Sequence, residues 1–285
     1  QSNQIANSIT GHSESTITSS ANTTHLRVSG CNFSDGGEAV FTSQAHTSFD
    51  YIVTNSQFKD YKYVTYSTIG GAEKTEKKMT INNNVFDNCG PIYFAAVTPS
   101  SIYENTAMSH IFINGNTFIN STMKFEHVGY INVSNNNFYW DNTKTPKYDY
   151  TTNPLSAQQG FNHFIHFDRL YLQNNVFEYP STYNANTQFG LLLQHNNVVR
   201  KTSAGVDTEY LYPQDVKVNG NTFAGFKYAI CTVNTNAPQN LNLTKEAVGW
   251  EYKNNIIYMS RSTGSGNGVG IFVDPGVVAD GNTIY

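Results

Sequence analysis

The sequence predicts an all-β solenoid of about ten coils, and three observations support this fold class. A short pattern returns ten times along the 285 residues: alternating apolar residues, Gly or Asn, usually Asn, one spacer and an apolar residue. Successive copies lie between 20 and 39 residues apart. Only Gly and Asn occur at the first corner position. A constant motif with variable spacers indicates one fixed corner per coil, with connecting segments of free length.

The repeated motif predicts a strand followed by a sharp turn. Its copies span residues 26–33, 51–58, 79–86, 111–118, 131–138, 170–177, 192–199, 216–223, 250–257 and 277–284. Alternation of apolar and polar residues is typical of a strand with one buried face. Gly and Asn tolerate a positive φ best, so each strand should end in a left-handed corner.

The second corner position predicts a ladder of side-chain amides. It holds Asn in eight copies, while the first two copies have Cys31 and Ser56. Coils should stack at roughly 4.8 Å, the spacing of neighbouring strands. Stacked amides at that spacing can hydrogen-bond to one another and to the corner backbone, which satisfies buried polar atoms. The apolar residue that closes each copy, mostly Phe, should form a second stack inside the solenoid.

Short apolar runs between the corners predict one more strand in most coils. These runs are residues 38–43, 62–67, 91–97, 123–127, 163–167, 227–233 and 269–274. The longest remaining spacer, 139–161, carries Trp140, Tyr148 and Tyr150. Exposed aromatic rings of this kind can stack on the faces of sugars. Alternatively, the loop packs its own rings on the solenoid.

On these motifs the chain resembles a single-stranded right-handed parallel β-helix of the pectate-lyase-like superfamily, over residues 23–285. In that fold each coil carries three short strands, and an asparagine ladder lines the corner between the second and third. The general appearance is similar to chondroitinase-B-like and alginate-lyase-like proteins. The resemblance implies a substrate groove along the outer first sheet, walled by loops. It does not supply catalytic residues: the acidic clusters of polygalacturonases and the Arg-x-Pro-x-x-Arg segment of pectate lyases are absent.

Composition favours one extracellular or cell-surface domain over residues 1–285, which could be a segment of a longer chain. Charged residues make up only 13%, against roughly 25% in average domains, and the net charge of −4 argues against nucleic acid as a partner. No run of 18 apolar residues exists, so we expect no membrane span. The three cysteines, an odd count, are expected to be free.

Register along the motif predicts a row of outward side chains across five consecutive coils. The row consists of Asp50, Lys78, His110, Tyr130 and Arg169, each eight places before the closing apolar residue. Stacked in this way, cations and acceptors would alternate along a groove. The plainer interpretation is that solvent-facing strand positions are simply polar.

A second cluster is predicted on the first strands of two successive coils. Lys124, Glu126 and His127 lie in one coil, and an offset of 39 residues places His163 over Lys124 and His166 over His127. The cluster would lie beside the 139–161 loop. The plainer interpretation is a set of ordinary exposed residues and one hydrogen-bonded histidine.

These candidates suit a lyase acting on an acidic polysaccharide. Such an enzyme needs a cation that neutralises the uronate carboxylate and a base that takes the C5 proton. We hypothesise Lys124 or His166 as base and Arg169 as neutralising cation. His163, His127 and Tyr130 are further catalytic candidates, and the candidates for substrate binding are Trp140, Tyr148, Tyr150, Lys78, His110 and Glu126. No cofactor is indicated; calcium is left open, although no motif points to it.

Two functions therefore stay open at this point. One is a polysaccharide lyase or glycoside hydrolase. The other is a non-catalytic β-helix that binds glycans, mediates adhesion or builds a structure or filament. The second gains from the absence of known catalytic motifs, and from a last coil with no capping helix, which predicts end-to-end or lateral self-association.

Overall fold

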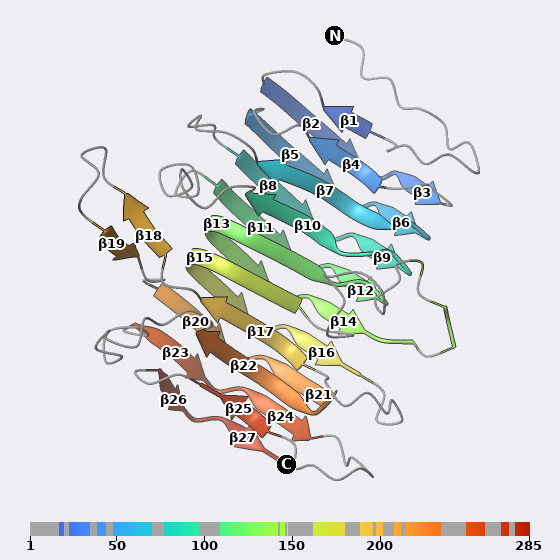
Figure 1. Cartoon of the computed structure of the whole chain (residues 1–285). Coiled ribbons are helices and arrows are strands. Elements are labelled where there is room, and N and C mark those ends of the chain that lie inside the picture. The colour runs from blue at the N-terminus through green and yellow to red at the C-terminus, as the bar shows by residue number, and fades with distance from the viewer. Residues whose placement is uncertain are drawn as a thin grey trace.

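The computed structural model describes residues 17–19, 23–34, 39–43, 48–69, 77–96, 109–141, 143–145, 147, 162–179, 189–195, 198–201, 208–211, 215–234, 249–259, 269–273 and 277–285. All regular structure in these residues is β-strand, and no helix occurs among them. The strands stack in parallel from the N-terminal to the C-terminal end of the molecule (Figure 1). The parallel β-helix expected from the repeat is confirmed.

The strands form three faces, of which the first and second join in one 16-stranded sheet. The first face contains β1 (Ile17–Ser19), β4 (Ala39–Ser43), β7 (Tyr63–Ile69), β10 (Ile92–Ala96), the first halves of β13 (Met123–Ser134) and β15 (Asn162–Gln173), β17 (Phe189–His195), β22 (Tyr228–Asn234) and β25 (Val269–Phe272). The second face contains β2 (Thr23–Ser29), β5 (Ser48–Thr54), β8 (Lys77–Asn82), β11 (Ser109–Asn114), the second halves of β13 and β15, β20 (Asp215–Asn219), β23 (Trp250–Lys253) and β26 (Val278–Asp280). All the runs predicted as further strands fall on the first face.

The third face is a separate nine-stranded parallel sheet. It contains β3 (Asn32–Ser34), β6 (Gln57–Lys59), β9 (Val85–Asp87), β12 (Thr117–Ile119), β14 (Asn137–Tyr139), β16 (Val176–Glu178), β21 (Thr222–Phe226), β24 (Ile256–Met259) and β27 (Thr283–Ile284). The remaining two strands, β18 (Val198–Lys201) and β19 (Thr208–Leu211), pair antiparallel with each other. They are inserted between the first and second faces of one coil.

The corner between the second and third faces has the left-handed geometry expected from Gly and Asn. Positive φ values of 51 to 67° occur at Gly30, Asn55, Asn83, Gly115, Asn135, Asn174, Gly220, Asn254 and Gly281. The asparagines that follow are buried and bonded from coil to coil. Asn84 Nδ2 donates to Asn116 Oδ1 at 3.0 Å, and Asn116 Nδ2 donates to Asn136 Oδ1 at 2.9 Å. These amides thereby satisfy one another inside the corner.

The phenylalanine stack is confirmed beside this ladder. Phe33, Phe58, Phe86, Phe118, Phe138, Phe177 and Phe223 lie ring on ring, with neighbouring centroids 4.4 to 5.1 Å apart. Five of these seven rings are at most 1% exposed. A fully buried Phe contributes about 1.5–3 kcal/mol through removal of apolar surface from water. The stack is therefore a principal source of cohesion between coils.

The motif copy at 192–199 is wrong as a predicted corner. Leu192 pairs with His163 on the first face, and the ladder passes directly from Asn175 to Asn221 across 46 residues. Asn196 and Asn197 lie outside the described residues. The structure therefore shows nine such corners in the described residues rather than ten. The copy resembles the motif because local alternation and an Asn pair do not reveal which face a strand joins.

A second left-handed corner, between the third and first faces, was not anticipated. Positive φ values occur two residues after the stacked Phe at Asp60, Asn88 and Asn120. The sharpest of these turns joins β21 to β22 through Lys227 alone, and Gly225 adopts φ +82° there. An added Cβ on Gly225 would lie 1.9 Å from the Tyr179 carbonyl oxygen, so this close approach requires glycine.

Candidate functional site

Two strands cross from the first face to the second without interruption, and they carry most of the predicted site. β13 and β15 are each 12 residues long, and they lie side by side in the middle of the stack (Figure 1). In the coils on either side the two faces are formed by separate strands: β10 ends at Ala96 and β11 begins at Ser109, while β17 ends at His195 and β20 begins at Asp215. In β13 and β15, by contrast, the strand runs from the first face to the second with no connecting segment between them. Their outward side chains therefore form one surface that spans both faces.

The register between these strands brings together the residues predicted from the 39-residue offset. Lys124 pairs with His163, and Tyr130 pairs with Arg169. The same offset holds on both sides of His127 and His166, since Glu126 pairs with Ile165 and Val128 with Phe167. The backbone of the cluster is thus aligned as expected, whereas the side chains of His127 and His166 lie outside the described part of the structure.

Lys124 is held by an ion pair within its own strand. Its Nζ lies 2.6 Å from Glu126 Oε1, and the two side chains are 12% and 23% exposed. The same ammonium lies 5.9 Å from the centroid of the Tyr93 ring. A lysine held as the cation of an ion pair donates hydrogen bonds and has no lone pair to accept a proton. The geometry thus favours Lys124 as a positive contact for a ligand rather than as a base.

The outward row predicted on the second face is present and in register. Asp50 pairs with Lys78, Lys78 with His110, His110 with Tyr130, and Tyr130 with Arg169. The row then continues to Asp215. Burial alone would raise the pKa of Asp50, but the hydrogen bond and charge of Arg27, the charge of Lys78 and the hydrogen bond of His25 together hold that pKa below its ordinary value. Asp50 is thus an ionised end to the row.

Three aromatic rings lie together on the outer side of the second face, and two of them were not among the residues predicted from the sequence. Phe112, Tyr130 and Tyr171, which we call the aromatic platform, come from β11, β13 and β15 and are partly exposed. The Phe112 and Tyr130 centroids are 5.4 Å apart, and those of Tyr130 and Tyr171 are 5.5 Å apart. The alternating pattern of the strands could have identified Phe112 and Tyr171 as outward residues, because each lies between two inward apolar residues.

Neighbouring charges fix Tyr171 in this platform. Its hydroxyl donates a hydrogen bond to Asp215 Oδ2, and the Lys217 ammonium lies 5.5 Å from the ring centroid. The hydrogen bond to Asp215, together with burial, raises the pKa of Tyr171 to about 12. Lys217 Nζ also lies 3.5 Å from Asp215 Oδ1. Lys217 thus partly balances the charge of Asp215, and the phenol of Tyr171 stays protonated.

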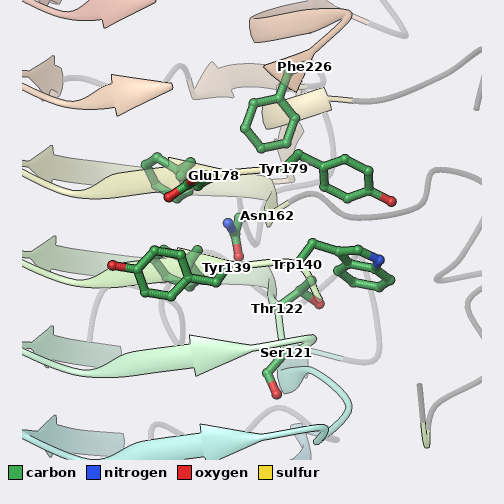
Figure 2. Close-up of a pocket in the computed structure, with 10 residues that line it drawn as sticks. Ser121, Thr122, Tyr139, Trp140, Asn162, Glu178, Tyr179 and Phe226 are labelled. Carbon is green, nitrogen blue, oxygen red and sulfur yellow. The ribbon is translucent and has the colours of Figure 1, made fainter. Parts of the chain in front are cut away.

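Trp140, one of the three aromatic residues predicted on the long loop, does not join this surface. Trp140 lies at the corner between the third and first faces and stacks on Tyr179, with ring centroids 5.4 Å apart (Figure 2). Both rings line a pocket that Asn162 and Ser121 also border. Asn162 Oδ1 already accepts a hydrogen bond from the Met123 backbone. Trp140 thus has a packing role here, and Tyr148 and Tyr150 lie outside the described residues.

No metal centre is found in the part of the chain that the structure describes, where no three His, Cys, Asp or Glu side chains are grouped to hold an ion. Among the same residues no helix is long and apolar enough to cross a membrane. Comparison with protein-family models, curated proteins and solved structures gives no match to this chain. The fold assignment therefore rests on the strand pairing, and the outward surface of β13 and β15 is the candidate functional site.

Proposed function

We propose that this protein binds an acidic polysaccharide along the outer surface of β13 and β15, as a secreted or cell-surface β-helix related to the pectate-lyase-like superfamily. The observation that carries the proposal is the register that places Lys124 beside His163 and Tyr130 beside Arg169 on two uninterrupted strands. Arginine and lysine bind carboxylates through charge-assisted hydrogen bonds, and the guanidinium can do so with two parallel bonds.

The direction of the ligand follows from the repeat. Equivalent side chains recur at each coil with the spacing of neighbouring strands, about 4.8 Å, which is close to the length of one sugar unit. A polysaccharide that lies along the solenoid axis would thus meet a similar outward position at each successive unit. Lys78, His110 and Arg169 lie in one such line. A chain with a carboxylate on each unit would thus pass Lys78 and Arg169, with the ring of His110 between them.

The test is equilibrium binding of the purified protein to polygalacturonate, alginate and glycosaminoglycans by isothermal titration calorimetry. Loss of one charge-assisted contact should weaken binding about tenfold, so we expect this loss from Lys124→Ala and from Arg169→Ala. Lys59→Ala is the matched control, because Lys59 lies on the third face with its side chain 59% exposed. Equal affinities for all three variants, or no binding to any acidic polysaccharide, would overturn the proposal.

A lyase is the second candidate, favoured by the position of Arg169 beside Tyr130 and by the aligned backbone of His166. Arg169 would neutralise the uronate carboxylate while His166 or Tyr130 takes the proton from C5. The C4–C5 double bond then forms as the C4–oxygen bond breaks, and the departing oxygen takes a proton from the protonated base or from water. Incubation with the same polysaccharides, with and without calcium, should produce the absorbance of the unsaturated product. A flat trace on all substrates would leave the binding function alone.

Self-association stays a prediction, which sedimentation velocity would test.

A further inference from the structure

The aromatic platform has no role in packing the core, since its three rings lie on the outer side of the second face. Phe112, Tyr130 and Tyr171 come from three successive coils, and each is partly exposed. Large apolar groups grouped on an outer surface commonly mark a binding site. Phe112 is the most informative of the three, because it has no polar atom that would explain an outward position on a strand.

The charges around the platform define what it could bind. Arg169 is exposed beside Tyr130, and Lys217 is 37% exposed beside Tyr171. Asp215, the adjacent carboxylate, already accepts the Tyr171 hydroxyl and lies 3.5 Å from Lys217. Lys217 and Arg169 therefore place positive charge at the rim of the platform, and Lys217 partly balances the charge of Asp215. Rings flanked by cations suit a ligand that has both an apolar face and negative charge.

We propose that Phe112, Tyr130 and Tyr171 form a stacking subsite for the pyranose rings of an acidic polysaccharide, which extends the binding surface of β13 and β15 over the second face. The inference rests on the proposed function and names the part of the ligand that this subsite takes. A pyranose presents C–H groups on one face, which pack on an aromatic ring, while its carboxylate reaches the cation at the rim. Tyr171 is a positioning residue as well, because its hydroxyl donates a hydrogen bond to Asp215 Oδ2 and so fixes where that carboxylate lies relative to the platform.

The experiment compares polygalacturonate with its fully methyl-esterified form, which has the same sugar rings without charge. Phe112→Ala should weaken binding of both ligands about tenfold, because stacking does not depend on charge. Lys124→Ala should weaken binding of the charged form only. Phe112→Leu keeps the apolar volume without the ring and should behave as Phe112→Ala, which guards against an effect of lost packing. Tyr139→Ala is the control, an exposed ring (38%) on the third face.

Tyr171→Phe separates the ring from its hydroxyl. The ring remains, so binding of the methyl ester should be unchanged, whereas binding of polygalacturonate should fall because Asp215 loses its hydrogen-bond donor. Binding to the wild-type protein should also perturb the tyrosine absorbance.

Three results would overturn the subsite. The first is unchanged affinity of Phe112→Ala and Phe112→Leu while Lys124→Ala is impaired, which leaves the proposed function standing. The second is unchanged affinity of every variant, which removes both. The third is a self-association that Phe112→Ala abolishes without an effect on sugar binding, which would assign the platform to a contact between two copies.

Discussion

Three glycines with positive φ allow backbone strain to be separated from close packing. At Gly30 (φ +65°) an added Cβ would meet nothing within 4 Å. At Gly115 (φ +67°) it would lie 2.5 Å from Asn83 Oδ1, the end of a flexible side chain. At Gly225 (φ +82°) it would lie 1.9 Å from the Tyr179 carbonyl oxygen. Substitution by alanine adds the same methyl group at all three sites, so the differences report the surroundings.

The expected magnitudes follow from three contributions. A left-handed conformation costs alanine about 1–2 kcal/mol, and its more restricted unfolded chain offsets about 0.4–1 kcal/mol of that cost. Gly30→Ala should therefore lower the free energy of unfolding by about 1 kcal/mol. Gly115→Ala should cost little more, because the Asn83 side chain can turn away. Gly225→Ala has to displace backbone, which adds about 1–3 kcal/mol, so we expect a total of about 2–4 kcal/mol.

The Tyr179 backbone cannot retreat easily from Gly225. Its amide donates a 2.9 Å hydrogen bond to the Ala224 carbonyl, the residue before Gly225. Moving this segment would disturb the pairing of β16 with β21, which Glu178 and Ala224 also form. The close approach of Tyr179 to Gly225 is therefore fixed by the hydrogen bonding between β16 and β21.

Urea unfolding, monitored by circular dichroism and tryptophan fluorescence, gives the free energy of unfolding of the three variants. The comparison requires equal m values, since a solenoid can unfold in parts and equal slopes show that the same unit unfolds. The order should be Gly30→Ala, then Gly115→Ala, then Gly225→Ala with the largest loss. A Gly225→Ala variant within about 0.5 kcal/mol of Gly30→Ala would refute the reasoning, because that difference lies inside ordinary additivity error.

Two further predictions concern buried polar and titratable groups. Asn116→Ala removes the acceptor of the Asn84 backbone and side-chain amides and should lower the free energy of unfolding in urea by about 3 kcal/mol. Asn282→Ala changes a part-buried position of the ladder and should lower it less. Equal losses for the two variants would contradict the ladder as a buried network. Burial raises the pKa of the Cys89 thiol to about 12, so at pH 8 a thiol reagent should modify the partly exposed Cys31 and leave Cys89 intact until the protein unfolds. Because that pKa is raised in the folded state, the associated stability is present below about pH 9 and is lost as the pH rises towards 12. Urea titrations at successive pH values should show this decline in the free energy of unfolding, and Cys89→Ala should weaken it.

Much of the fold could be read from the sequence because its determinants are local. A corner residue such as Asn83 indicates a positive φ, and the alternation of residues before it indicates which side chains point inward. Register then follows by counting from corner to corner, which placed Lys124 beside His163 correctly. The count was wrong at 192–199, where the same local pattern belongs to a strand of the first face that pairs with the start of β15.

The candidate site was anticipated only in part, since its setting depends on pairing over long distances. Nothing local in 123–134 or 162–173 distinguishes one uninterrupted strand from two strands with a turn between them. Phe112 and Tyr171 were recognisable as outward residues, but their proximity to Tyr130 depends on the stacking of three coils. The ion pair between Lys124 and Glu126, which bears on the role of the lysine, required the side-chain geometry.

The sequence by itself determined most of the coil: nine corners between the second and third faces, the inward residues of their strands, and the asparagine and phenylalanine stacks. Backbone preference and burial act there on a few adjacent residues. Only the tertiary structure decided which face each strand joins, where the chain crosses between faces without a break, and which outward side chains meet. Those outcomes arise from pairing between strands whose partner residues are 20 to 46 positions apart, and such pairing leaves no mark on the local pattern.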